Sequence, residues 1–166
     1  MPFTPFHIGP GLFIGILLHS YVDFVSILIS SVAVDAEPFL IIMLRLNTPL
    51  HGFFHTYLGG TIITVLTAVG IYLVRGLLNK LLEWFRIQQE SSFKRIFYSS
   101  LFGVYLHLLL DSFLYGEMNP FYPLTGNPLL GLASASFVYE FCTLSIIFGF
   151  ILYIYKFILR KPTKQR

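Results

Sequence analysis

A short polar stretch, PLHGFFHT at residues 49–56, lies between two apolar runs. If this stretch opens a helix, as the long apolar segment after it indicates, the side chains of His51 and His55 lie one turn apart on the same face. Two imidazoles in this arrangement can bind one metal ion. The stretch therefore predicts the start of a helix that carries metal ligands.

The same ligand chemistry recurs in two other apolar segments. HLLLD at residues 107–111 places His107 and Asp111 four residues apart, again on one face of an expected helix. A third apolar run ends with the carboxylates of Asp35 and Glu37. Three separate segments thus offer metal-type ligands, and we expect them to meet at a single site.

The composition indicates which solvent surrounds the protein. Of the 166 residues, 55% are hydrophobic and only 11% are charged, whereas soluble domains have about 25% charged residues. We therefore interpret residues 1–166 as one integral membrane domain in a lipid bilayer. The net charge is +3, and the Lys and Arg residues are grouped along the sequence. No nucleic-acid partner is needed to explain them. The single Cys excludes an intrachain disulfide, and the oligomeric state stays open.

The apolar runs predict an all-α, polytopic membrane helix bundle with about four to five transmembrane or half-membrane helices. The first run, residues 8–18, is short and is expected to be tilted or half-inserted. The others cover residues 24–46 with an interruption, 56–74, 96–115 and 133–159. The interruption, at residues 35–38, includes Pro38, which disfavours helix at the residue before it. Because a broken helix is tolerated in a membrane only beside protein or a water-filled cavity, the break indicates a cavity.

The distribution of positive charge predicts the topology. Residues 75–95 mix Lys and Arg with Leu, Trp and Phe, which is typical of an amphipathic helix at the membrane interface, although a straight extension of the preceding span is an alternative. A second basic cluster, residues 160–166, follows the last run. The positive-inside rule places both clusters, and the C-terminus, in the cytoplasm. The two histidine motifs then share the extracytoplasmic side of the inner or plasma membrane.

Ionisable side chains are costly in a membrane, about 2.5–3.5 kcal/mol each at a helix centre, and they are functional candidates by default. A divalent cation would neutralise the carboxylates and use neutral imidazoles. Mixed nitrogen and oxygen ligands suit zinc, with Mn, Fe or Co as alternatives. If His7 is counted, the candidate ligands exceed one tetrahedral shell, so we expect one or two ions. These ligands are His7, Asp35, Glu37, His51, His55, His107 and Asp111.

Four motifs occur in order along the chain: PFTPFHIGP from residue 2, SVAVDAEP from residue 31, PLHGFFHT from residue 49 and HLLLD from residue 107. Together they resemble the membrane-bound, metal-dependent hydrolases of bacteria and archaea, the group that includes the LexA-binding inner-membrane hydrolases. The resemblance spans roughly residues 2–130. It implies a hydrolase whose metal site is built from the residues just named, with His7 as an addition. A looser likeness is to zinc-dependent phospholipase C, where His-x-x-x-Asp ligands recur on helices.

The chain departs from this group in two motifs. Bacterial members often read His-Arg-Gly-x-Thr-His-Ser, one residue longer between the histidines. They also often have Asp-x-Asp where this chain has Asp35-Ala36-Glu37. The Arg that is missing here would act as a phosphate clamp, so the substrate class stays open between a lipid phosphoester and a lipid-linked amide.

Each candidate also has an ordinary structural interpretation. The two His-containing pairs could be interfacial or hydrogen-bonding groups, and the acidic pair could end a short helix in water. His7 could be an interfacial imidazole. His19 and Asp23 lie at a connection between apolar runs and are expected to be solvated. Tyr115 shares the face of Asp111 and either orients a ligand or belongs to an aromatic belt.

The expected chemistry is metal-assisted hydrolysis. A bound metal lowers the pKa of its water and polarises the scissile group, while a carboxylate accepts the proton. Glu37 is the expected base, with Glu140 in the last run as the reserve. A site that opens to the outer leaflet favours an amphiphilic substrate, with its tail in the bilayer. Two alternatives stay open: a metal or ion transporter, and a structural or regulatory membrane protein in which a metal only joins the helices.

Overall fold

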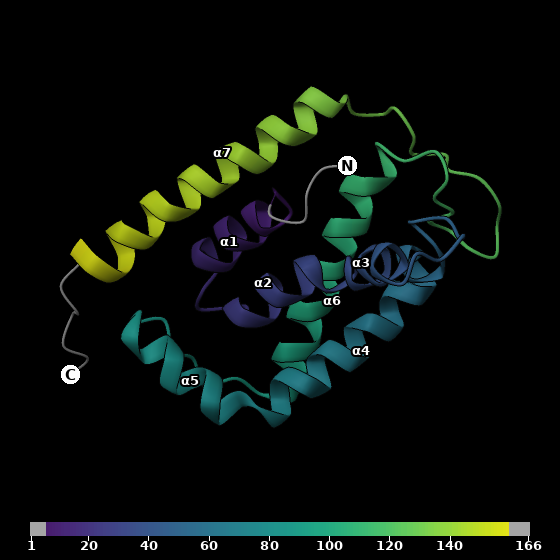
Figure 1. Ribbon diagram of the computed structural model, residues 1–166. Coiled ribbons are helices and arrows are strands. Elements are labelled where there is room, and N and C mark those ends of the chain that lie inside the picture. The colour runs from purple at the N-terminus through teal and green to yellow at the C-terminus, as the bar shows by residue number, and fades with distance from the viewer. Residues whose placement is uncertain (1–5, 160–166) are drawn as a thin grey trace.

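The computed structural model describes residues 6–159, and every regular element in that range is helical (Figure 1). The helices are α1 Ile8–Leu17, α2 Phe24–Ala33, α3 Ala36–Met43, α4 Tyr57–Leu73, α5 Arg75–Trp84, α6 Phe93–Ser112 and α7 Ala135–Tyr153. A 3₁₀ turn, Phe53–His55, precedes α4, and a π-helical segment, Ile154–Leu159, extends α7. The predicted all-α class is confirmed. The beginning of the N-terminal motif and the basic segment 160–166 lie outside the described residues.

Within residues 6–159, two helical stretches are long and apolar enough to cross a membrane: Phe24–Met43, which joins α2 and α3, and Ala135–Leu159. Helices α4 and α5 form a third only if they count as one span, and they are bent by 74°. The bend shows that α5 is not a straight extension of α4, which was one of two predicted alternatives. Helix α1 is short, as predicted. Helix α6 has 20 residues but is not among these stretches, because polar side chains such as His107 and Asp111 lower its hydropathy.

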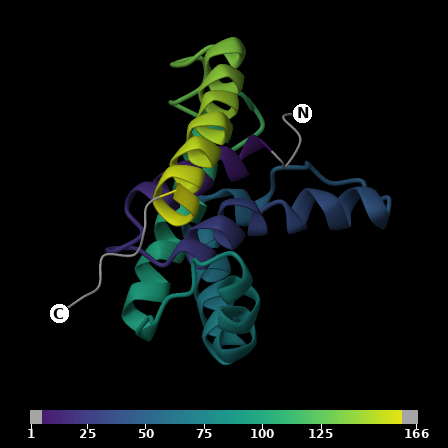
Figure 2. The ribbon, with the colours of Figure 1, turned by 90° about the vertical axis from the view of Figure 1, so that its left-hand side faces the viewer.

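The interruption predicted at residues 35–38 is present, at Val34 and Asp35, between α2 and α3. Pro38 lies in the first turn of α3, where its missing amide hydrogen is tolerated. The Asp35 amide bonds the Val32 carbonyl at 3.1 Å, three residues back instead of four. The Ser31 carbonyl has therefore lost the partner that a continuous helix would provide. Figure 2 shows α3 projecting from the rest of the molecule.

Glycines allow close contacts between the helices of the bundle. Helix α1 lies against α7, and α2 lies against α6, which also contacts α4. A Cβ on Gly9 would lie 2.3 Å from the Cys142 carbonyl oxygen, and a Cβ on Gly103 would lie 2.7 Å from the Ile27 carbonyl oxygen. These backbones can approach so closely only because the glycines have no side chain. The second contact sets the distance between α2, which ends at the break, and α6, which carries the HLLLD motif.

A buried polar network joins the loop before α2 to α5. The expectation that Asp23 is solvated is wrong, because its side chain is fully buried. It caps α2 by accepting a hydrogen bond from the Ser26 amide at 2.9 Å, and its Oδ2 lies 2.7 Å from Nη1 of Arg75. Ser91 donates a further hydrogen bond to this carboxylate at 2.7 Å. The segment between α5 and α6 folds over Asp23, which local sequence patterns could not indicate.

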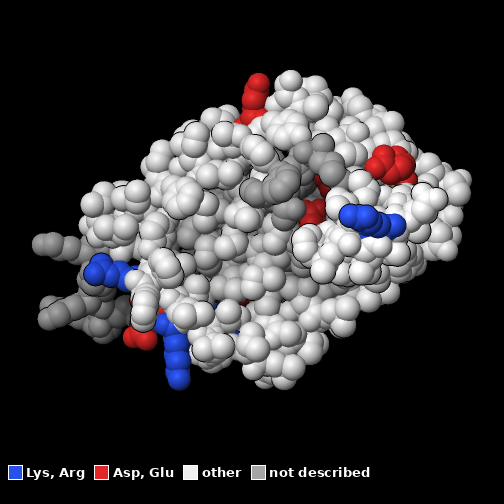
Figure 3. All heavy atoms as spheres, viewed as in Figure 1, with Lys and Arg blue, Asp and Glu red and all other residues white. Residues whose placement is uncertain are grey.

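The outer surface is unusually apolar. Most of the face seen in Figure 3 carries no charged side chain. Helix α5 buries none of its residues, and its Trp84 is 86% exposed. Exposed apolar area of this extent is expected where lipid surrounds the helices, so it supports membrane association.

Candidate metal site

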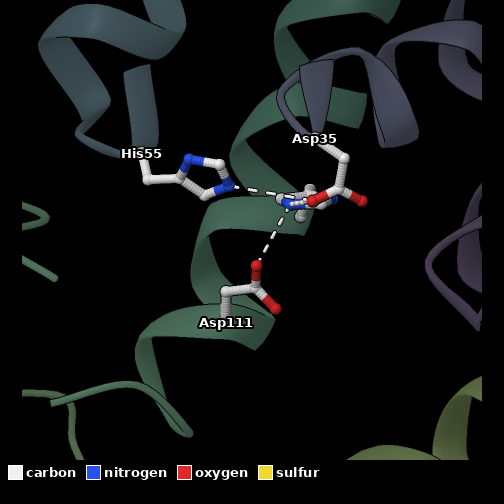
Figure 4. Close-up of side chains that lie close together, drawn as sticks. Asp35, His55 and Asp111 are labelled. Carbon is white, nitrogen blue, oxygen red and sulfur yellow. Dashed lines mark ion pairs between the residues drawn. The ribbon is translucent and has the colours of Figure 1, made fainter. Parts of the chain in front are cut away.

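Four side chains from three parts of the chain meet inside the bundle. Asp35 comes from the break between α2 and α3, His55 from the 3₁₀ turn, and His107 and Asp111 from α6. One ligand atom from each lies within 4.8 Å of the others. Figure 4 shows Asp35, His55 and Asp111 turned toward one another. These four residues, hereafter the Asp/His group, bring the three predicted ligand segments together in an arrangement that could hold a metal ion.

The distances within the Asp/His group are short. Nε2 of His107 lies 3.2 Å from Oδ2 of Asp111 and 3.5 Å from Oδ1 of Asp35. Nε2 of His55 lies 3.8 Å from the same Asp35 oxygen. His107 and Asp111 meet because one helical turn separates them, as their spacing predicts. All but Asp35 are buried, so protein encloses the group.

Both imidazoles of the group are fixed by an acceptor on their far nitrogen. Nδ1 of His55 lies 2.8 Å from Oε2 of Glu37, and Nδ1 of His107 lies 2.8 Å from the Ser31 carbonyl oxygen. In a neutral imidazole, an Nδ1–H that donates in this way leaves Nε2 with a free lone pair, as metal-binding histidines require. Both Nε2 atoms are buried, and among the described residues they make no hydrogen bond. Since buried polar atoms rarely lack a partner, the group fits a cation at its centre.

The helix break serves this site in two ways. It places Asp35 at the centre of the group. It also releases the Ser31 carbonyl, which then accepts the hydrogen bond from His107. A carbonyl freed at membrane depth has to find such a partner within the protein.

His7 lies beside the group, just before α1. Its Nε2 is 3.1 Å from Oδ1 of Asp111, and its ring centroid is 4.1 Å from that of His107. The side chain is buried, and its Nδ1 has no hydrogen-bond partner in the described part of the chain. The structure therefore brings His7 next to a ligand, while its own role as a ligand stays a prediction.

The expected helix through His51 and His55 is not formed. Helix α4 begins only at Tyr57, after Thr56 caps it by accepting a hydrogen bond from the Gly59 amide at 2.9 Å. The one-turn spacing predicted for the two imidazoles therefore does not apply. Their rings are still neighbours, with centroids 4.8 Å apart.

His51 makes a different contact from His55. Its Nδ1 lies 2.8 Å from Oε1 of Glu117, and its ring stacks on that of Tyr115 with centroids 3.9 Å apart. Glu117 was not predicted from the sequence, because it lies in a Pro- and Gly-rich loop. Its only sequence signal is that it is an acidic residue a few positions after Asp111.

The two predicted catalytic carboxylates lie outside the group. Glu37 faces the far nitrogen of His55 and also accepts a hydrogen bond from the Phe54 amide at 3.3 Å. A Cβ on Gly52 would lie 2.6 Å from Oε1 of Glu37, so a glycine leaves room for this carboxylate. Glu140 is exposed on α7. The contacts of Glu37 are those of a residue that positions His55.

The two histidines before α4 have opposite pKa shifts. Burial lowers the pKa of His51, and it outweighs the opposing effect of Glu117. Burial also acts to lower the pKa of His55, but the carboxylates of Asp35 and Glu37 outweigh it and raise that pKa. His55 thus lies in the more negative surroundings, which would also attract a metal cation.

Comparisons with protein-family models, with curated proteins and with solved structures find no match for this chain. The resemblance carried by the four motifs is therefore an expectation that these comparisons leave untested. The function has to be argued from the geometry of the site.

Proposed function

We propose that this chain is a membrane-embedded, metal-dependent hydrolase that acts on an amphiphilic substrate, a lipid phosphoester or a lipid-linked compound. One observation carries the proposal. Both imidazoles of the Asp/His group have their Nδ1 held by an acceptor and present a buried, unpartnered Nε2 beside two carboxylates. Metal-binding histidines are oriented by their outer neighbours in this way.

The donor set suits zinc, with Mn, Fe or Co as alternatives, because it combines imidazole nitrogens with carboxylate oxygens. Asp35, His55, His107 and Asp111 would hold one ion. Without a cation, the group would enclose two carboxylates whose charges are costly to remove from water. When bound, the metal would polarise the scissile group and make water a stronger nucleophile.

Other side chains of this protein would prepare the site. Glu37 would position His55, while its role as the catalytic base stays a prediction. His51 and Glu117 line a cavity of about 320 Å³, together with Asn119 and Tyr122. Apolar atoms form most of its wall, but these side chains supply polar groups beside the segment that carries His55. This cavity, hereafter the head cavity, would therefore receive the polar head of the substrate.

The membrane part of the proposal is supported by the candidate spans and by the apolar surface. We infer a multi-pass protein of the inner or plasma membrane, with the C-terminus in the cytoplasm and the site toward the extracytoplasmic side. The motif resemblance to membrane-bound, metal-dependent hydrolases supports the same reaction class.

The metal content of the detergent-purified protein, measured by elemental mass spectrometry, tests the first step. We expect about one equivalent of a transition metal in the parent protein and none in a His55→Ala, Asp111→Ala double variant. His19→Ala removes an imidazole outside the group and should leave the metal in place. A parent protein without metal, even after incubation with zinc or manganese, would overturn the proposal.

The second step is tested with lipid substrates of both classes. The metal-loaded parent should release the polar product from a lipid phosphoester or from a lipid-linked amide, and a chelator should abolish this release. A protein that holds its metal and cleaves neither class would show that the hydrolase assignment is wrong.

A structural role is the second candidate, and the burial of the group favours it. His55, His107 and Asp111 are 0%, 1% and 2% exposed, and the group connects three elements. A catalytic metal keeps an open position for substrate, whereas a structural metal does not. If the metal is only structural, chelation should lower the temperature of thermal unfolding, and there should be no hydrolysis for it to abolish.

A further inference from the structure

A second cavity, of about 460 Å³, also borders the segment before α4. Its walls come from α3, from residues 48–54 and from α4, and most of its lining is apolar, including Leu40, Ile41, Phe53, Phe54 and Ile63. We propose that this cavity, hereafter the apolar cavity, binds one hydrocarbon chain of the substrate. The inference rests on the proposed function and deepens it, because it says which part of the molecule holds the tail.

Glu37 connects the apolar cavity to the Asp/His group. It is the charged residue in the lining, and both of its oxygens are already engaged. Oε2 lies 2.8 Å from Nδ1 of His55, and Oε1 accepts from the Phe54 amide at 3.3 Å. A carboxylate occupied in this way offers little to a charged or polar ligand. The cavity therefore favours an apolar occupant while it remains in contact with a residue that touches the group.

The head cavity borders the same segment. The two cavities share Pro49, Gly52 and Phe53 in their walls, but one is lined by the side chains of α3 and the other by His51 and Glu117. A molecule with an apolar tail in one and a polar head in the other would cross this segment next to His55. Two cavities of different character that meet at one segment beside His55 match the two ends of an amphiphile.

The surroundings of α3 indicate how a hydrocarbon chain would reach the apolar cavity. Leu40 lines the apolar cavity and is also 49% exposed, and its neighbours Phe39 and Met43 are 64% and 67% exposed. Helix α3 belongs to Phe24–Met43, one of the stretches apolar enough to cross a membrane. If α3 is surrounded by lipid, a hydrocarbon chain can enter the cavity directly from the bilayer without passing through water. The occupant is therefore the tail of a substrate that enters from the bilayer.

Photolabelling tests the apolar cavity without any need for turnover. The probe is a monoacylglycerol with a diazirine in the middle of its chain, added to the detergent-purified full-length protein, and the labelled peptides are identified by mass spectrometry. Leu40→Trp should fill the cavity, while Leu66→Trp makes the same change at a 63% exposed position of α4 outside the lining. Ile63→Trp, on the opposite wall, is the second variant if the first cannot be purified. Metal content is measured in the same samples.

We expect label on residues 36–63 of the parent and of Leu66→Trp. Label in Leu40→Trp should fall about tenfold, as when about two methylene groups lose their buried contacts. Label spread over all exposed apolar helices, or unchanged in Leu40→Trp, would overturn the proposal. Unchanged label with an altered oligomeric state in Leu40→Trp would identify a second copy of the chain as the occupant, and would overturn it too. Label in the apolar cavity of a protein that holds no metal would support the binding of a hydrocarbon chain there. It would refute only the proposed hydrolase.

Discussion

Oε2 of Glu37 lies 2.8 Å from Nδ1 of His55. Nδ1 is the ring nitrogen that does not face the Asp/His group, whereas Nε2 faces Asp35. A carboxylate in this position orients the imidazole, selects its tautomer and makes Nε2 a better ligand. The contact therefore adds an expectation about metal binding to the expectation that Glu37 is the catalytic base.

Glu37→Gln should weaken metal binding by about 10–100-fold, the usual effect of removing such an outer carboxylate. The amide still accepts a hydrogen bond, so the protein should fold normally. The dissociation constant for zinc, measured by competition with a chelator of known affinity, checks this. Glu140→Gln makes the same substitution at an exposed position and should leave the constant unchanged. Unaltered zinc binding in Glu37→Gln with lost turnover would instead restore Glu37 as the base.

Gly52→Ala should have a similar effect on zinc binding without any change to a polar group. The added Cβ would lie 2.6 Å from Oε1 of Glu37 and would push this carboxylate away from His55. Gly70→Ala is the control, because a Cβ there meets nothing within 4 Å. The same chelator competition is the measurement. If Gly52→Ala binds zinc as tightly as the parent, the position of Glu37 does not matter.

Asp23→Ala should lower the thermal stability strongly. The side chain is fully buried and paired with Arg75, and truncating one partner of a buried ion pair costs about 3–5 kcal/mol. Thermal unfolding in detergent, followed by circular dichroism, is the measurement. Glu90→Ala removes an exposed carboxylate in the same region and should change the unfolding temperature little. Equal shifts in the two variants would mean that the pair is not a stabilising contact.

Gly103→Ala should separate α2 from α6. The added Cβ would meet the Ile27 backbone oxygen at 2.7 Å, and backbone cannot yield as a flexible side chain can. Overpacking of this kind costs about 1–3 kcal/mol. It should also weaken zinc binding, because Asp35 follows the end of α2 and His107 lies on α6. Unfolding temperature and zinc affinity should both fall relative to Gly70→Ala. A loss of stability with full zinc affinity would show that the site tolerates movement between these helices.

Much of the fold could be predicted from the sequence, because apolar runs and a proline report on local structure. Their lengths predict helices, and the proline after Asp35 predicts the break. His107 and Asp111 could also be paired in advance, since both lie within one continuous helix and four residues always make one turn. The four members of the Asp/His group were all among the predicted ligands.

The remaining features depend on contacts between distant segments. His51 and His55 have the same spacing as His107 and Asp111. Helix α4 starts after both histidines, so their spacing does not place them on one helix face. Glu117 reaches His51 from a loop, and Asp23 is buried by the segment between α5 and α6. Residue patterns along the chain carry no information about such contacts, and they could not show that Glu37 faces Nδ1 of His55.

The Ser31 carbonyl links two positions that are far apart in the chain. It accepts the hydrogen bond of His107, while the Asp35 amide bonds Val32 instead. A substitution that restored a continuous helix would give this carbonyl to Asp35 and leave His107 without its acceptor. Substitutions at the break and at His107 should therefore have non-additive effects on metal binding. Once one of them is made, the other should weaken metal binding little further. The interruption and the histidine would be inherited together or lost together.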